Sequence, residues 1–360
     1  MIKIHLPARR KSGVALIMVM IAIAVFTLLA AAFAFSMKVE TKLAQNADNE
    51  QQLLWLGRSG VELARWVLAE EAATTRYDAL NQIWAGGPGG GAETNSPLTG
   101  IPLDNYTIGD GTVSIKIVDL ERKANINTAT TPVLQLALTT MGVDANDLSV
   151  VSDSILDWID ADDSPHVAGA ESDYYQSLTP PYYSKNAPID DLSELLLIKG
   201  VTPEMYDLTN SPVAQQPKRQ KLGFGNSPGE VPVYAFGLKD VFTPFSNGKI
   251  NINTAGTNVL MLIQGVDAAA ADAIVKYRAG PDGAEGTEDD QPVAGSNFGQ
   301  LTTAGIGPQI IQRIQQACTT RSSTFEVHVT AHVLDSTREY TAILFRNSGT
   351  DIRVLSFYWK

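Results

Sequence analysis

The chain has 360 residues, of which 44% are hydrophobic and 18% are charged, and this ordinary composition excludes a wholly disordered chain. Its formal net charge of −12 argues against a nucleic-acid partner, because an acidic surface repels phosphate backbones, and favours cations or basic protein surfaces. The single cysteine, Cys318, excludes an intramolecular disulfide and is expected to be a small buried hydrophobe.

The first predicted element is an apolar helix behind a short basic segment. Residues 14–35 carry no charge, and at about 1.5 Å per residue a helix of this length spans roughly 33 Å, enough to cross a bilayer. The basic side should stay cytoplasmic while the rest of the chain crosses the membrane. A secretory signal peptide would end after small residues such as 30–32, but here the apolar run continues to Phe35.

The start of this helix resembles the leader of a type IV prepilin, because Lys-Ser-Gly at residues 11–13 directly precedes the apolar run. In that class, prepilin peptidase cuts after the glycine and keeps the helix in the mature protein. The resemblance therefore implies that Gly13 and Val14 are the processing residues. It also implies a single-pass protein of the inner membrane, with its C-terminal body in the periplasm.

The helix should continue well beyond the membrane. Apolar residues recur at three- and four-residue intervals between residues 53 and 68, which predicts one helix to about Thr75 with half of it packed on a domain. A glycine- and proline-rich loop follows at residues 86–91. The alternation of apolar and polar residues over 112–120 then predicts a strand.

A repeated block follows the strand. Asn-Ile-Asn-Thr-Ala at residues 125–129 returns at 251–255, and each copy leads into an apolar segment and a glycine turn. We expect the threonine of each block to cap a helix, and the asparagines to close a turn before it. The duplicated units have the shape of helix–hairpin–helix motifs, with partial copies near Gly200 and Gly305. Asp144 and Asp267 beside two turns would repel a phosphate, which favours a packing role.

The C-terminal segment alternates again over 324–358, which predicts three antiparallel strands. The predicted fold is therefore α+β, of the type IV pilin-like kind: a long N-terminal helix packed on a small antiparallel sheet, with a large, mainly α-helical domain inserted. The predicted divisions are a leader at 1–13, a transmembrane helix at 14–35, the first part of the pilin-like domain at 36–123, the inserted domain at 124–320 and the second part at 321–360.

Two acidic loops are candidate calcium sites. Carboxylates on a turning backbone supply the hard oxygen ligands that calcium requires, and crowding them without a cation costs folding energy. A plain solvated acidic loop is the alternative at both places. The candidate ligands are Asp160, Asp162, Asp163, Glu171 and Asp173 in the first loop, and Asp282, Asp289 and Asp290 in the second.

Catalysis has little support, so we expect a protein that is not an enzyme. The sequence contains no Gly-x-Ser-x-Gly, P-loop or His-Glu-x-x-His motif. His328 and His332 would share one face of a strand, which indicates a structural role. A membrane-tethered, calcium-dependent envelope hydrolase is the alternative function.

Taken together, these residues resemble the K-class minor pseudopilins of the type II secretion system. The resemblance rests on the Lys-Ser-Gly leader, residues 58–64, both repeated blocks, and residues 157–162, 169–171, 174–175 and 191–195. It implies calcium in the inserted domain and a place at the pseudopilus tip, where the protein promotes initiation and capping during protein export across the outer membrane. The implied partners are the I- and J-class minor pseudopilins and the major pseudopilin.

The fifth residue after the predicted cut is Met18. Major pilins carry a glutamate there, which is thought to pair with the N-terminal amine of a neighbouring subunit. A buried carboxylate without a cationic partner is costly. A subunit with no neighbour above it has no such amine to pair with, so Met18 fits the topmost position in the assembly.

Overall fold

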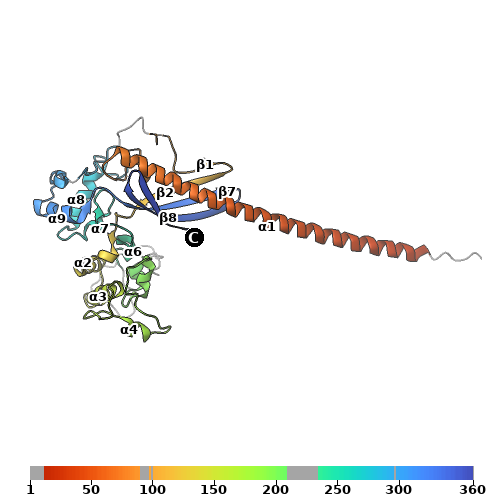
Figure 1. Cartoon of the computed structure of the whole chain (residues 1–360), viewed down its shortest axis with the longest axis horizontal. Helices are drawn as coiled ribbons and strands as arrows, with labels where there is room; N and C mark the ends of the chain where they lie inside the picture. Colours follow the sequence, from red (N-terminus) through yellow and green to blue (C-terminus); the bar gives the residue numbers. More distant parts are fainter. Residues whose placement is uncertain (1–11, 90–96, 99, 209–233, 296, 360) are drawn as a thin grey trace, which may run out of the picture.

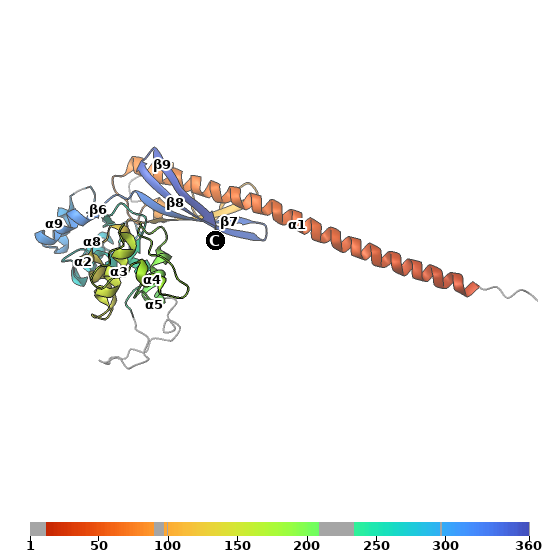
Figure 2. The same cartoon turned by 60° about the horizontal axis from the view of Figure 1, so that its bottom comes forward.

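The computed structural model describes residues 12–89, 97–98, 100–208, 234–295 and 297–359. Most of the predicted leader and residues 209–233 of the predicted inserted domain lie outside the described part. A long helix projects from a body that contains a sheet and many short helices (Figures 1 and 2).

Helix α1 spans Ser12–Thr74, so the single long helix expected from the sequence is present. Its first half is bare: the side chains from Val14 to Asp48 are all exposed, and Leu53 is the first buried residue. By length and composition, it is the one helix among the described residues that could cross a membrane. Its second half packs on the sheet.

The sheet has five antiparallel strands in the order β1-β2-β7-β8-β9. Four of them match the predicted alternating segments, and only the short β1 was not predicted. The strands are β1 (Tyr106–Ile108), β2 (Gly111–Asp119), β7 (Thr324–Val333), β8 (Ser336–Ser348) and β9 (Asp351–Trp359).

One face of this sheet and the second half of α1 form the first of two hydrophobic cores. Strand β2 directs Val113, Ile115 and Ile117 into this core. The helix approaches the sheet closely at Gly60, where an added Cβ would lie 2.5 Å from Val329 Cγ1. The 3₁₀ turn η1 (Ile83–Ala85) closes one end of the core and places Trp84 edge-on against Phe325, with ring centroids 5.5 Å apart.

The chain between β2 and β7 forms the second core from short helices and 3₁₀ turns. This block begins and ends at neighbouring points, because Leu120 N–H donates to Thr324 C=O at 3.0 Å. Its elements are η2 (Ile126–Thr128), α2 (Thr131–Met141), α3 (Leu148–Ile159), α4 (Ser172–Gln176), η3 (Leu192–Leu197), α5 (Pro203–Tyr206), α6 (Leu238–Val241), α7 (Thr257–Leu260), α8 (Ala268–Arg278), η5 (Phe298–Ala304) and α9 (Pro308–Ala317).

The two repeated blocks have the same local geometry. Asn125 Oδ1 accepts from the Asn127 N–H at 2.8 Å, and Asn251 Oδ1 accepts from the Asn253 N–H at 3.0 Å, as the predicted Asn turns require. Each block also carries one strand of a short parallel pair. These pairs join β3 (Ala124–Asn125) to β4 (Phe242–Thr243) and β5 (Ile250–Asn251) to β6 (Cys318–Thr319). Cys318 is buried at the end of the second pair.

The predicted capping role of the block threonines is wrong. Helix α2 has Thr130 at its N-cap and α7 has Gly256, and neither makes a side-chain cap. Thr254 instead donates its hydroxyl hydrogen to Asp119 Oδ2. The Thr254 hydroxyl therefore binds an acceptor at the end of β2 that is distant in the sequence, and it is not used to cap a helix.

Candidate metal centre

The carboxylates of the first acidic loop converge at the C-terminal end of α3. The chain leaves this helix through Asp160 and returns through residues 166–171 to α4. One ligand atom each of Asp160, Asp162 and Glu171 lies within 4.8 Å of the others. Asp157, Asp160 and His166 form a second group of the same kind, so Asp160 belongs to both.

Three buried oxygens in this cluster lack a hydrogen-bond partner among the described residues: Asp157 Oδ2, Asp160 Oδ1 and Glu171 Oε1. The Asp157 side chain is fully buried and Glu171 is 4% exposed. Buried carboxylate oxygens normally find donors, because leaving one unpaired costs about 1–3 kcal/mol. Three such oxygens in one place indicate a binding site for a ligand that interacts with carboxylates.

The electrostatics favour a cation. Burial and the neighbouring charges of Asp157 and Asp160 raise the pKa of Glu171 to about 7. Burial together with Asp162 and Asp157 also raises the pKa of Asp160. Both Asp157 and Asp160 lie at the C-terminus of a helix, where its dipole disfavours further negative charge. A bound cation would relieve all of these costs.

The loop is held around the cluster by contacts that do not use the free oxygens. The Lys199 ammonium donates to Gly169 C=O at 3.0 Å, and the Asn186 amide donates to Asp162 C=O at 2.7 Å. Glu171 uses only Oε2, which accepts from the Ser184 hydroxyl at 2.8 Å. A Cβ at Gly169 would lie 1.8 Å from Asp157 Oδ2, so only glycine allows the loop to approach this closely.

The other predicted ligands of the first loop lie outside both groups. Asp163 is exposed, and its Oδ1 accepts from the Ser172 N–H at 3.3 Å. Asp173 is exposed in the first turn of α4.

The second acidic loop uses its carboxylates internally. Asp289 Oδ2 accepts from the Asp282 N–H at 3.0 Å, and Asp290 Oδ2 accepts from the Gly286 N–H at 2.8 Å. Hydrogen bonds from Thr287 and the Asp282 backbone lower the pKa of Asp289. Among the described residues, these acids form no group with the spacing of a metal site.

Two members of the cluster were not among the predicted ligands: Asp157 and His166. The His166 Nδ1 and backbone N–H both contact Asp157 Oδ1, and this hydrogen bond raises the pKa of the imidazole. The donor set of the cluster is mainly carboxylate oxygen, which suits calcium better than a transition metal. The residues that would hold such an ion are Asp157, Asp160, Asp162 and Glu171.

The predicted processing and assembly residues lie in the bare half of α1. Gly13 is in its first turn, and the side chains of Val14 and Met18 are 52% and 65% exposed. His328 and His332 lie on the same face of β7, and Thr341 and Thr337 on β8 are their hydrogen-bonding neighbours.

Comparison with known proteins gives a consistent result. Residues 115–214 match the family described as type II secretion system (T2SS), protein K. A putative type II secretion system protein K of Escherichia coli K12 is 42% identical over 74 residues, which is 21% of this chain and 23% of that protein. The type II secretion system protein K of Pseudomonas aeruginosa is 25% identical over 324 residues, covering 86% of this chain and 85% of that one.

The matched segment is 23% of the length of each of the first two relatives, those from Escherichia coli and Pectobacterium carotovorum. In structure, the chain is similar to one in the crystal structure of the GspK-GspI-GspJ complex from the type 2 secretion system of enterotoxigenic Escherichia coli. The TM-score is 0.60 at 19% identity, with 88% of this chain and 99% of that chain covered. At this identity the likeness establishes the fold.

The described residues thus combine one apolar helix that could cross a membrane, an antiparallel sheet packed on the second half of that helix, and a helical block between two strands of the sheet. In sequence, residues 115–214 match the type II secretion system protein K family, and the chain is similar to a protein K of Pseudomonas aeruginosa over most of its length.

Proposed function

We propose that this protein is a minor pseudopilin at the tip of the type II secretion pseudopilus, where it helps to initiate and cap the fibre during protein export. The observation that carries this proposal is the place of the helical block. Its helices α8 and α9 lie at the end of the body opposite the bare half of α1 (Figures 1 and 2). Bulk at that end would obstruct the addition of a further subunit.

The partners follow from the family and from the bare helix. The structural relative belongs to a GspK-GspI-GspJ complex, and we infer that I- and J-class minor pseudopilins bind this chain in the same way, with the major pseudopilin below them. Helix α1 leaves a long exposed apolar surface from Val14 onward, which would otherwise face only lipid. Co-purification of the full chain with both classes of partner, and its loss when α1 is cut short, would support this arrangement.

Processing by prepilin peptidase tests the membrane part of the proposal. Cleavage after Gly13 would leave a single-pass inner-membrane protein whose body lies in the periplasm. We expect mass spectrometry of the mature protein to find a methylated Val14 at the N-terminus. An intact Met1, or a cut near Ala32, would contradict the pilin route.

Met18 tests the tip position itself. A glutamate at this position would need an N-terminal amine from a subunit above it, so Met18→Glu should reduce the fraction of fibres that start from this protein. Met20→Glu is the matched control, because it places the same charge two residues further along the exposed helix. Equal effects of the two variants, measured as pseudopilus number, would count against a specific role for Met18.

We further propose that calcium binds among Asp157, Asp160, Asp162 and Glu171. The support is the three buried oxygens without partners, and the ion would supply structural cross-linking of the loop to α3. Thermal unfolding of the full chain in detergent should shift to lower temperature with chelator and recover with calcium. Asp160→Asn should reduce this shift, whereas Asp282→Asn in the second loop should leave it unchanged; a midpoint insensitive to chelator would reject the metal.

A catalytic role is the weaker candidate, and we infer that the protein is not an enzyme. The cluster lies beside a helix end, and the cavities of about 440 and 400 Å³ found elsewhere in the described chain are not lined by its residues. A calcium-dependent hydrolase would require turnover that disappears in Glu171→Gln. We expect to find no such turnover in the folded protein.

A further inference from the structure

The outer edge of strand β2 is only partly covered. Strand β1 pairs with β2 from Gly111 to Val113, and one more bond follows where Ile115 N–H donates to Leu103 C=O at 2.7 Å. Backbone groups that face one edge recur every second residue, so the N–H and C=O of Ile117 face this same edge. In the described part of the chain, no strand pairs with β2 there.

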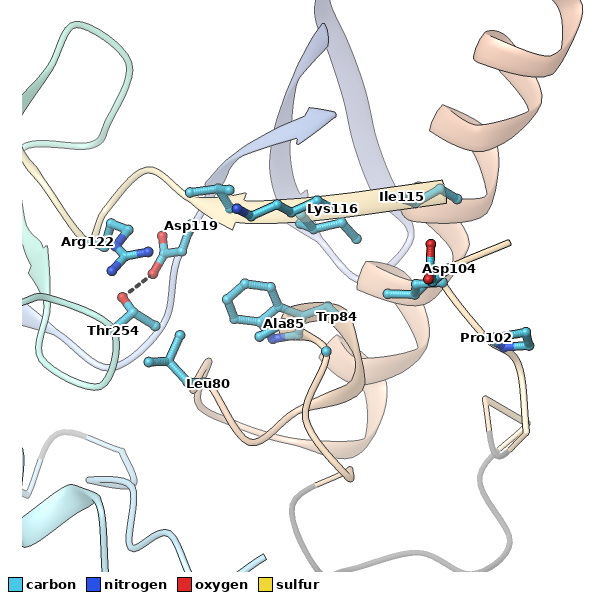
Figure 3. A pocket seen from close by; sticks show the side chains of 14 residues that line it. Leu80, Trp84, Ala85, Pro102, Asp104, Ile115, Lys116, Asp119, Arg122 and Thr254 are labelled. Carbon is cyan, nitrogen blue, oxygen red and sulfur yellow. Dashed lines mark hydrogen bonds between the residues drawn. The ribbon is translucent and has the colours of Figure 1, made fainter. Parts of the chain in front are cut away.

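A cavity of about 440 Å³ lies along this open edge. Figure 3 shows it between β2 and the turn that carries Leu80 and Trp84, with Pro102 at one end and Thr254 at the other. The floor is apolar, and one wall is the part of the β2 edge that no strand covers in the described chain. An exposed strand edge of this kind is a template on which an extended peptide can add as a further strand.

The two acidic side chains that line the cavity already accept hydrogen bonds from neighbouring groups. Asp119 is buried, and its carboxylate accepts from Thr254, Asn251 and the Glu121 N–H. Asp104, at the opposite end, accepts from the Ser114 hydroxyl.

Two cations in the same cavity remain available. Lys116 and Arg122 line it, and neither has an ion-pair partner within the described residues. Figure 3 shows the Lys116 side chain running along β2 toward the end that carries Asp119 and Arg122. Because Asp119 is buried, the side chains at this end that can form an ion pair with a ligand are Lys116 and Arg122.

We propose that this groove binds an extended acidic segment of a partner protein. The segment pairs with β2 at Ile117 as an antiparallel strand. It continues the strand pairing that residues 103–108 form beside β2, which does not extend as far as Ile117. Its acidic side chain lies near Lys116 and Arg122, and its apolar side chains contact Trp84 and Leu80. This inference uses only the β2 edge, so it is independent of the proposed tip position and of the calcium site.

The test uses the full chain in detergent micelles and two labelled heptapeptides. Both alternate valine and threonine, and their central residue is glutamate in one and lysine in the other. Fluorescence anisotropy should show at least tenfold tighter binding of the glutamate peptide. Lys116→Glu combined with Arg122→Glu should lower that affinity at least tenfold, and the milder Lys116→Gln with Arg122→Gln should lower it in the same direction. Lys276→Glu, an exposed lysine on α8 outside the groove, is the control and should have no effect.

Hydrogen exchange identifies the mode of binding. The glutamate peptide should slow exchange of the Ile117 amide, which a purely electrostatic contact would not do. The proposal is overturned if neither peptide binds, if both bind equally, or if the glutamine pair leaves affinity unchanged in a folded protein. It is also overturned if the Ile117 amide is already protected without peptide, because the chain itself would then cover the edge.

Discussion

At single positions, the second asparagine of each repeated block joins two distant segments. Asn127 pairs its amide with both backbone groups of Ile189, accepting from N–H at 2.7 Å and donating to C=O at 3.0 Å. Asn253 does the same with Val293, at 2.8 and 3.0 Å. A side-chain amide used this way replaces one rung of a strand ladder. The repetition in the sequence therefore reflects a repeated way of fastening loops to the helical core.

Asn253→Ala should destabilise the protein by about 2–4 kcal/mol, because it leaves the buried N–H and C=O of Val293 without partners. Asn127→Ala is the matched control in the other copy, where the asparagine is only half-buried, and should cost less because water can reach the freed groups. Denaturant unfolding of both variants measures the difference. Equal, small losses would show that the amide pairing contributes little.

The pH dependence of stability should depend on Glu171. Without a bound cation, burial and the nearby aspartates raise the pKa of its folded form to about 7 from 4.5. The folded state then holds the proton more tightly than the unfolded state, so stability falls as pH rises from about 4.5 to about 7. The loss should be about 1–3 kcal/mol.

Unfolding in chelator at pH 5 and pH 8 measures this loss, and added calcium should remove most of it. Glu171→Gln should reduce the slope in chelator. It should not abolish the slope, because the raised pKa of His166 acts in the same direction: its stabilising contact with Asp157 weakens as the imidazole loses its proton. A slope that is the same in the variant and the parent would refute the role of Glu171.

The candidate site could be predicted only in part. Five acids close together in the chain were predicted as ligands of the first loop, and three of them, Asp160, Asp162 and Glu171, do converge. Asp157 and His166 were missed because they meet only after the loop folds back on α3. In the second loop, the density of acids in the sequence was misleading in the other direction. These acids are as close together in the chain, but they accept hydrogen bonds from backbone N–H groups of their own turn.

At the scale of the elements, the strands that could be predicted are those in which apolar and polar residues alternate along the sequence. Strands β2 and β7 bury alternate residues along most of their length, so the alternation in the sequence matches their burial. Strand β8 buries five consecutive residues, Tyr340–Leu344, and β9 buries only Ile352, so their alternating sequence predicted the strands but not which side chains are buried. Strand β1 and the parallel pairs β3–β4 and β5–β6 have only two or three residues per strand, too few to show a period. The pairing of β3 with β4 and of β5 with β6 also depends on contacts between segments more than 60 residues apart.

The contact between α1 and the sheet depends on glycine. Gly60→Ala would place a methyl group 2.5 Å from Val329 Cγ1, and the resulting overpacking should cost about 1–3 kcal/mol, more than alanine gains as a helix former. Gly307→Ala is the control, because nothing lies within 4 Å of its added Cβ. Thermal unfolding that ranks the two variants equally would contradict this account of the interface.

For the whole molecule, the helical block is an insertion whose ends nearly meet. Because Leu120 and Thr324 are hydrogen-bonded and Asp119 pairs in register with Phe325, a short turn could join β2 to β7 directly. Replacing residues 124–320 by such a turn should leave the helix-and-sheet body folded, since that body has its own core.

If the block caps the fibre, this shortened chain should no longer stop growth, and pseudopili in a reconstituted or overexpressing system should lengthen. Electron microscopy of sheared fibres measures the length distribution, and circular dichroism confirms that the shortened body is folded. An unchanged distribution, with the shortened protein still incorporated, would place the cap elsewhere.

The unbroken course of α1 also fixes how the body is oriented about the helix axis. Residues 36–48 are helical and exposed, so they connect the membrane segment to the body with no joint. Each residue added there would raise the body by about 1.5 Å and turn it by about 100°. One inserted residue would therefore aim the sheet and the helical block at different neighbours. Seven inserted residues would return them to within about 20° of the original direction, so the angular phase of this segment matters more to assembly than its composition.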